Sequence, residues 1–199
     1  MTNQKLIILD RDGVINIESP DFIKTPEEWE PIKGSLEAIG RLSQAGYEIV
    51  IITNQSGLGR GLFSANTLAK IHNKMIDYIQ QYGGKIQSIL FCPHLPDDDC
   101  ECRKPKDGMY KELASRLNIS FSDVYSVGDS VRDLLAAKKA GALPVLVKTG
   151  NGKKSVKQIS SELTLDLNDT PVFDNLSSFT NALLSKNRSI NFYKNNSSA

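Results

Sequence analysis

The sequence lacks the features that mark membrane proteins and nucleic-acid-binding proteins. Its longest apolar runs, such as residues 142–147, are far shorter than the about 20 residues that span a bilayer. The chain has 24 basic and 23 acidic residues with the two signs interspersed, so it has no basic stripe for nucleic acid or an anionic membrane. Residues 1–5 show no signal-peptide pattern. We therefore expect a cytoplasmic, monomeric protein with neither kind of partner.

Cysteine is also scarce, and its placement is informative. The chain has 3 cysteines, which join one histidine in the spacing C-x-H-x5-C-x-C: Cys92, His94, Cys100 and Cys102. An odd, clustered number of cysteines in a reducing compartment favours metal over disulfides, and this ligand set is typical of tetrahedral zinc. The alternative is a group of free cysteines beside a surface histidine. Because zinc would have all its ligands from the protein, we expect a structural site that holds the loop at residues 92–102.

Short apolar runs alternate with amphipathic stretches along the chain. The runs predict strands near residues 6–9, 47–52, 86–91, 124–127 and 144–147. The stretches predict helices near residues 35–45, 64–82, 109–117 and 131–140. The only histidine outside the cysteine cluster, His72, falls in the second helix, where we expect it at the surface. Such alternation is typical of βαβ units, so we expect an α/β fold with a mostly parallel, three-layer, Rossmann-like sheet.

Two segments interrupt the alternation. Residues 16–33 contain three prolines and the single tryptophan, and residues 92–107 are rich in Asp, Pro and Cys. Both predict irregular loops, and neither is long enough for a large cap domain. One last strand and helix are expected within residues 172–184. We therefore expect a single domain over residues 1–185, followed by a flexible polar tail over 186–199.

Three aspartates follow predicted strands. Asp10 and Asp12 come directly after the first strand, and Asp129 follows the fourth. Functional loops of open α/β sheets lie at such carboxyl ends. Three clustered carboxylates repel one another unless they share a cation, and oxygen ligands favour Mg²⁺. On their own, Asp10 and Asp12 would be an ordinary loop-capping pair. Asp133 is expected just behind the site, near the start of a helix.

Two other segments carry groups suited to phosphate. Thr53 and Asn54 follow the second predicted strand and precede a serine and a glycine. Arg103 and Lys104 lie in the loop ahead of the fourth strand. A lysine near an aspartate nucleophile would balance charge and hold a phosphoryl group, and an arginine binds phosphate in a bidentate manner. Taken singly, the first pair is an ordinary turn and the second is solvated surface.

Together these groups resemble the four ordered motifs of the haloacid dehalogenase superfamily of phosphohydrolases. The motifs are Asp10-Arg11-Asp12-Gly13-Val14, Thr53-Asn54, Lys104, and Gly128-Asp129 with Asp133. The resemblance implies that Asp10 is the nucleophile and that Asp12 moves protons to the leaving oxygen and from the attacking water. It implies that Thr53 and Lys104 hold the phosphoryl oxygens. It also implies that Mg²⁺ binds Asp10, the carbonyl of Asp12, and Asp129.

Within the superfamily, the Cys/His loop resembles one small branch. That branch contains the D-glycero-D-manno-heptose 1,7-bisphosphate 7-phosphatases and the histidinol-phosphate phosphatases. Residues 10–16, 53–57 and 61–63 follow the heptose pattern, whereas the gap between His94 and Cys100 has the length seen in histidinol phosphatases. The resemblance implies substrate contacts from a set of polar residues, the last of which replaces a lysine found in some members: Arg11, Glu18, Asp21, Asn54, Gln55, Ser56, Arg103 and Ser130.

The sequence therefore predicts a Mg²⁺-dependent, zinc-containing phosphatase that acts on a small phosphorylated sugar, the heptose bisphosphate. The same chemistry on histidinol phosphate is one alternative. A zinc-stabilised module that binds a phospho-ligand without turnover is another. Asp10 and Asp12, both intact, argue against the module.

Overall fold

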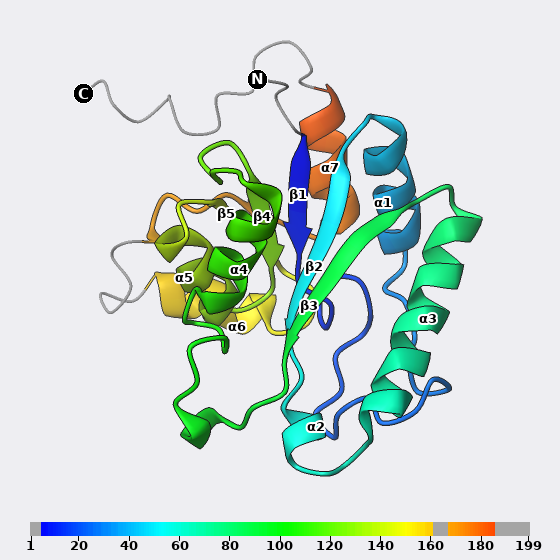
Figure 1. Cartoon of the computed structure of the whole chain (residues 1–199). Coiled ribbons are helices and arrows are strands. Elements are labelled where there is room, and N and C mark those ends of the chain that lie inside the picture. Colours follow the sequence, from blue (N-terminus) through cyan, green and yellow to red (C-terminus); the bar gives the residue numbers. More distant parts are fainter. Residues whose placement is uncertain (1–4, 161–166, 186–199) are drawn as a thin grey trace.

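The computed structural model describes residues 5–160 and 167–185. Its centre is a six-stranded sheet in the order β3-β2-β1-β4-β5-β6, in which all neighbouring strands are parallel (Figure 1). The strands are β1 (Leu6–Leu9), β2 (Glu48–Asn54), β3 (Ile86–Cys92), β4 (Tyr125–Gly128), β5 (Leu143–Val147) and β6 (Val172–Phe173). The expected α/β class and the parallel sheet are confirmed.

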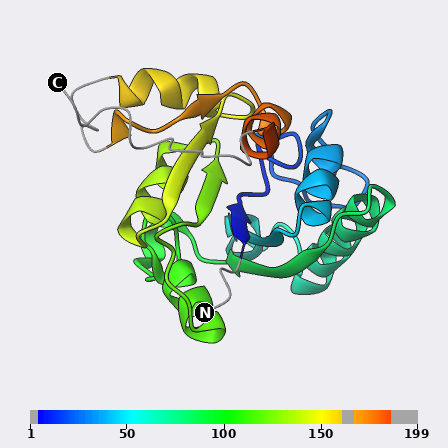
Figure 2. The same ribbon diagram turned by 90° about the horizontal axis from the view of Figure 1, so that it is seen from above.

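Helices cover both faces of this sheet. They are α1 (Ser35–Gln44), α2 (Ser56–Gly59), α3 (Ala65–Gln81), α4 (Gly108–Leu117), α5 (Val131–Lys139), α6 (Gly152–Ile159) and α7 (Leu176–Ser185), with a 3-10 turn η1 (Pro96–Asp98). The first core cluster joins α1, α3 and α7 to one face of the sheet, and two further clusters join α4, α5 and α6 to the other (Figure 2). The three-layer arrangement is therefore confirmed as well.

The central strand explains why its sequence is an uninterrupted apolar run. Ile7 and Leu9 pack toward α1, α3 and α7, while Leu6 and Ile8 pack toward α4 and α5. All four side chains are buried. A strand with helices on both faces buries every side chain, so it shows no polar alternation.

The irregular segment between β1 and α1 crosses the carboxyl edge of the sheet and is firmly anchored. Val14, Ile15 and Trp29 are buried, and the Trp29 ring meets the Tyr78 ring of α3 edge-on at 5.8 Å. Ser35 Oγ donates a hydrogen bond to the carbonyl of Val14 at 2.8 Å. Within the described residues this segment holds only isolated bridges and no helix or strand, so it forms no cap domain.

Several elements differ from the sequence prediction. β2 runs two residues further than expected, so Thr53 and Asn54 belong to the strand itself. The elements α2, η1 and α6 were not predicted from the sequence. In α6 the buried positions are Gly152, Ser155 and Ile159, a face too small and too polar to produce an apolar periodicity. The predicted tail, residues 186–199, lies outside the described residues, so the tail and the extent of the domain stay predictions.

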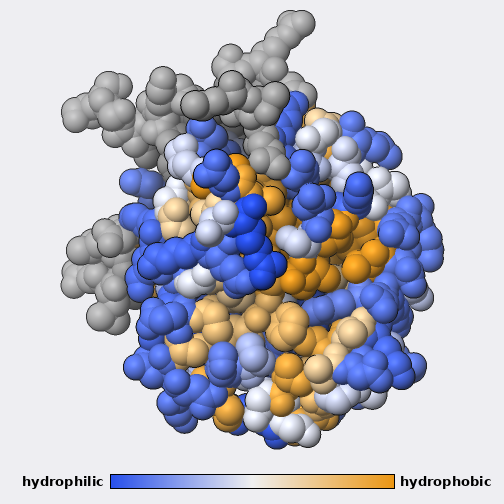
Figure 3. Space-filling model, in the orientation of Figure 1, coloured by the Kyte–Doolittle hydropathy of each residue, from blue (hydrophilic) through white to orange (hydrophobic). Residues whose placement is uncertain are grey.

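The surface over the edge strand β3 is partly apolar. Seen in the orientation of Figure 1, apolar side chains gather across the middle of the molecule, where the edge strand β3 runs, and polar side chains surround them (Figure 3). Phe91 of this strand is 39% exposed. None of the described helices combines the length and apolarity that a membrane span requires.

Candidate active site

A pocket of about 280 Å³ lies at the carboxyl edge of the sheet, which is the lower edge in Figure 1. Strand register creates it, because Leu9 of β1 lies opposite Ile51 of β2 and Val127 of β4, so that the residues after these positions meet. Most of the predicted site residues line the pocket: Asp10, Arg11, Asp12, Glu18, Thr53, Asn54, Gln55, Ser56, Arg103, Lys104 and Asp129. Asp133 lines it too, whereas Asp21 and Ser130 do not.

Lys104 is the centre of the charge network in the pocket. Its Nζ lies 3.1 Å from Asp10 Oδ1 and 2.6 Å from Asp133 Oδ1, and it donates to the carbonyl of Ile52 at 2.8 Å. The lysine is only 2% exposed. Burial by itself lowers the pKa of Lys104, but the two carboxylates outweigh burial and raise that pKa above its ordinary value. Lys104 is therefore a permanent buried cation.

Asp12 accepts hydrogen bonds on both carboxylate oxygens. Arg11 donates to Oδ1 from Nε at 3.1 Å and from Nη2 at 2.9 Å, and Nη2 also lies 2.9 Å from Oδ2. Asn16 donates to Oδ1 and Gln55 to Oδ2, both at 2.9 Å. Burial raises the pKa of Asp12, but the Arg11 charge and these hydrogen bonds outweigh it and hold the pKa below its ordinary value.

Asp10 has the opposite electrostatic environment, although it is only two residues away. Burial raises the pKa of Asp10 to about 7, with Lys104 opposing the rise and Asp133 and Asp12 adding to it. The backbone N–H of Arg11 donates to Asp10 Oδ1 at 2.8 Å. Two neighbouring aspartates with pKa values shifted in opposite directions are a common arrangement in sites that need two different acid–base roles.

Asp129 is packed against the backbone of two glycines. A Cβ atom on Gly13 or Gly150 would lie 2.1 or 2.2 Å from Asp129 Oδ2, and both glycines have positive φ, at 79° and 53°. Only glycine fits both requirements. Burial, together with the charges of Asp133 and Asp10, raises the pKa of Asp129 to about 9.

The carboxylates of Asp10, Asp129 and Asp133 form a cluster suited to a divalent cation. One oxygen from each lies within 4.8 Å of the others. Lys104 contacts two of the three, which leaves the cluster with an excess of buried negative charge. Hard cations with oxygen ligands relieve such repulsion, and Mg²⁺ is bound typically through one or two carboxylates plus substrate phosphate. The donor set therefore fits Mg²⁺.

Two predicted substrate-binding residues use their side chains to hold the site together. The Asn54 amide donates to the carbonyl of Lys104 and accepts from the Lys104 backbone N–H, each at 3.1 Å. Gln55 Nε2 donates to Thr53 Oγ1 at 3.0 Å as well as to Asp12. Asn54 therefore positions Lys104, and Gln55 connects the end of β2 with the loop after β1.

Other predicted contacts also have partners within the protein. Ser130 Oγ donates to Asp133 Oδ2 at 2.6 Å, so this hydroxyl supports the helix start behind the pocket. Arg103 Nη1 donates to the carbonyl of His94 at 3.1 Å. Glu18 accepts a hydrogen bond from the amide of Asn151. Asp21 is exposed and lies outside the pocket lining.

One charged residue of the pocket lining was not predicted from the sequence. Arg132 in the first turn of α5 lines the pocket, is exposed, and forms no ion pair with any carboxylate among the described residues. An exposed guanidinium at a pocket rim is suited to binding an anion. Arg132 lies three residues after Asp129, in the helical turn that also carries Asp133, and this position could have indicated that it reaches the pocket.

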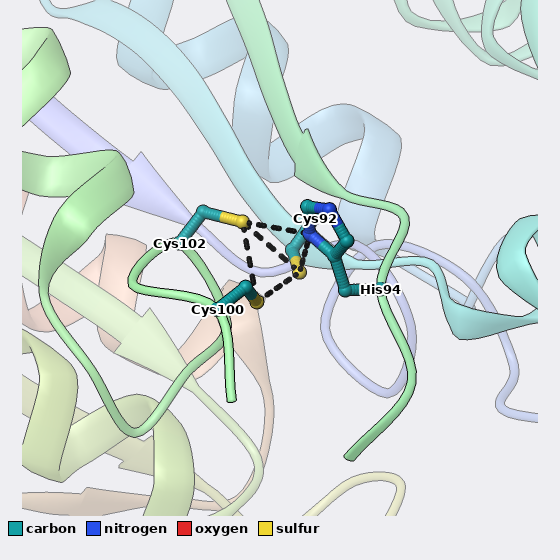
Figure 4. A group of neighbouring side chains, drawn as sticks. All are labelled: Cys92, His94, Cys100 and Cys102. Carbon is teal, nitrogen blue, oxygen red and sulfur yellow. Dashed lines mark hydrogen bonds between the residues drawn. The ribbon is translucent and has the colours of Figure 1, made fainter. Parts of the chain in front are cut away.

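The predicted zinc ligands converge on one point. The three sulfurs and the His94 ring face one another in Figure 4, with Cys102 Sγ 3.3 Å from Cys92 Sγ and 3.2 Å from His94 Nδ1. All three cysteines are free thiols. Zinc with sulfur ligands at about 2.3 Å would separate those sulfurs by about 3.8 Å, close to the observed spacing. The cluster therefore fits tetrahedral zinc in both ligand type and geometry.

The prediction that His72 lies at the surface is wrong. The residue is 8% exposed and belongs to the buried face of α3, next to Ile71 and one turn after Leu68. Its Nε2 lies 3.3 Å from Arg11 Nη1. Its polarity suggested exposure, but its position in the apolar repeat indicated burial.

Comparisons with known proteins agree with this geometry. A HAD-hydrolase-like family model matches residues 101–178. The chain is 54% identical over 154 residues to D-glycero-beta-D-manno-heptose-1,7-bisphosphate 7-phosphatase of Bordetella bronchiseptica, covering 77% of this chain and 86% of the relative. It is 47% identical over 183 residues to the protein of the same name from Neisseria meningitidis serogroup A, covering 92% and 96%.

Solved structures give the same result. The crystal structure of D,D-heptose 1,7-bisphosphate phosphatase from B. bronchiseptica, complexed with magnesium and phosphate, matches with a TM-score of 0.86 and 49% identity over 92% of this chain and 99% of that one. The corresponding structure from Burkholderia thailandensis matches with a TM-score of 0.70 and 41% identity, over 92% and 100%. The chain belongs to the haloacid dehalogenase superfamily and, within it, to the family of the D-glycero-D-manno-heptose 1,7-bisphosphate 7-phosphatases.

Proposed function

We propose that the protein is a phosphatase that hydrolyses the 7-phosphate of D-glycero-D-manno-heptose 1,7-bisphosphate in nucleotide-heptose synthesis, for lipopolysaccharide core or a related glycan. The observation that carries the proposal is the geometry around Asp10: its Oδ1 lies 3.1 Å from the buried Lys104 Nζ, and Asp12, two residues further along, lines the same pocket. The names of the relatives support the substrate. Monomeric state and cytoplasmic location stay predictions.

In the first step, a carboxylate oxygen of Asp10 attacks phosphorus and the bond from phosphorus to the sugar oxygen breaks. The 2%-exposed Lys104 and the 1%-exposed Thr53 hold the phosphoryl oxygens in a site with little water. Asp12 donates a proton to the departing sugar oxygen. Negative charge from the arriving substrate raises the pKa of a neighbouring carboxyl. Asp12 therefore takes up a proton when the substrate binds, and this is the proton that it donates.

In the second step, Asp12 is a carboxylate again and removes a proton from a water molecule. That water attacks the aspartyl-phosphate on Asp10, and phosphate leaves as the Asp10 carboxylate is regenerated. Asp10, Asp129 and the backbone carbonyl of Asp12 would hold Mg²⁺, with Asp133 close behind. The ion supplies positive charge that keeps Asp10 ionised and offsets the repulsion between carboxylate and phosphate.

The nucleophile is tested by replacing Asp10 with asparagine. D10N is expected to lower kcat for phosphate release by roughly a thousandfold or more, because the amide is not a nucleophile toward phosphorus. The matched control is D77N on the exposed surface of α3, which should retain full activity. Unchanged hydrolysis by D10N would remove Asp10 from the mechanism, and hydrolysis absent from the parent enzyme would favour the binding module.

The substrate is tested by steady-state kinetics on heptose 1,7-bisphosphate and histidinol phosphate. A higher kcat/KM on the heptose is expected, because the exposed Arg132 at the pocket rim offers a cation to a second phosphate. Histidinol carries an ammonium group, which the same arginine would repel. A higher kcat/KM on histidinol phosphate would contradict the proposed substrate and leave the chemistry intact.

We assign the non-reacting phosphate to the rim that carries Arg103 and Arg132. R132A should therefore raise KM for the bisphosphate, with kcat/KM falling roughly 10- to 100-fold, the range for a lost charge-assisted hydrogen bond. Heptose 7-phosphate lacks the second phosphate and should be hydrolysed by R132A as by the parent. R132K retains the charge and should recover part of the loss. Equal losses on both substrates would show that Arg132 does not recognise the second phosphate.

Zinc is proposed for Cys92, His94, Cys100 and Cys102, where it would hold the loop that leads into Arg103 and Lys104. Metal analysis after removal of Mg²⁺ should find about one zinc per chain. C100S should lose most of that zinc and unfold at a lower temperature, while D97N, an exposed change in the same loop, should keep it. Zinc far below one equivalent in the parent protein would contradict the assignment.

A further inference from the structure

A row of polar side chains connects the buried face of helix α3 with Asp12. Arg11 is 1% exposed and His72 is 8% exposed. Arg11 directs Nε and Nη2 to the Asp12 carboxylate and Nη1 to His72 Nε2, at 3.3 Å. Neither the substrate contacts nor the acid–base steps above give His72 a task. A buried polar chain that ends on a catalytic group is a candidate for positioning that group.

The hydrogen-bond direction in this row follows from chemistry. A guanidinium has only donors, so Arg11 Nη1 donates and His72 Nε2 accepts. His72 must then be neutral, with its proton on Nδ1. Burial, together with the charge of Arg11, lowers the pKa of His72 to about 4, which agrees with a neutral ring at neutral pH.

His72 is held in place by the packing of a regular helix. It lies on the buried face of α3, between the core residues Leu68 and Met75. Its ring meets the Phe91 ring of β3 edge-on, at 6.2 Å between centroids and 65° between planes. Asp12 and Arg11, by contrast, lie in the irregular segment after β1. The histidine therefore connects the irregular segment after β1 to a regular helix.

We propose that His72 is a positioning residue: it fixes the Arg11 guanidinium and, through it, the direction in which the Asp12 carboxyl meets the leaving oxygen. This inference rests on the proposed role of Asp12 as proton donor. Without an acceptor at position 72, Nη1 of Arg11 would be a buried donor with no partner there, and the guanidinium would turn toward other acceptors. Asp12 would then keep its charge partner and its hydrogen bonds from Asn16 and Gln55, but lose the fixed guanidinium geometry that aligns its carboxyl.

This role has a consequence that a packing role lacks. A sugar oxygen needs a proton as it departs, whereas 4-nitrophenolate leaves as a stable anion without one. The ratio kcat/KM covers only the steps up to departure of the leaving group. Loss of Asp12 orientation should therefore lower kcat/KM for a sugar phosphate and leave that for 4-nitrophenyl phosphate nearly unchanged.

The test compares H72F and H72Q on heptose 1,7-bisphosphate and 4-nitrophenyl phosphate. H72F keeps an aromatic ring against Phe91 and removes the acceptor, so kcat/KM for the sugar should fall about tenfold, a fraction of the usual contribution of acid–base catalysis. The aryl ester should change less than about twofold. H72Q places an amide oxygen near the former Nε2 and should restore most of the loss.

Controls separate this inference from the function on which it rests. I71V removes a buried methyl group from the adjacent position and should lower thermal stability without selectivity between the substrates. D12N should show the selectivity most strongly, and if it does not, the proton-donor role of Asp12 fails. If D12N is selective while H72F lowers both substrates equally or changes neither, the positioning role of His72 is overturned.

Discussion

A buried lysine between two carboxylates is the interaction on which the rest of the site depends. Lys104 joins Asp10 at the end of β1 and Asp133 at the start of α5, and it also donates to Ile52 of β2. Removing one partner would leave a charge buried without compensation, which is strongly unfavourable. The backbone of Lys104 is held in turn by Asn54. This one cation thus connects three elements, β1, β2 and α5, at a single edge of the sheet.

Around this cation, the environment gives two similar residues different chemistry. Asp10 is buried beside other carboxylates, and its pKa rises to about 7. Asp12 accepts hydrogen bonds from Arg11, Asn16 and Gln55, and its pKa falls below the ordinary value. One side chain is therefore sensitive to a bound cation, and the other to the charge of an arriving phosphate. Two successive displacements at phosphorus need one group that attacks and another that moves protons, and the two environments keep these carboxyls chemically distinct.

The pocket obtains its remaining features from loops rather than from a cap. The Cys/His cluster brings together the two ends of the segment that leads into Lys104, and Arg103 donates back to a carbonyl within it. Arg132 reaches the rim from the first turn of α5. An open site with cations at its rim suits an extended, doubly charged substrate, because the second charge need not be buried.

The sequence alone determined the strands, the ordered motifs and the Cys/His spacing, because apolar runs and local ligand spacing are short-range properties. Asp10, Asp12, Lys104 and Asp129 were recognised together for that reason, and each lines the pocket. The tertiary structure decided the contact between His72 and Arg11, the place of Arg132 at the pocket rim and the tasks of Asn54 and Gln55. These depend on contacts between residues far apart in the chain, and a side chain's partner there is set by sheet register and helix packing, which no local pattern encodes.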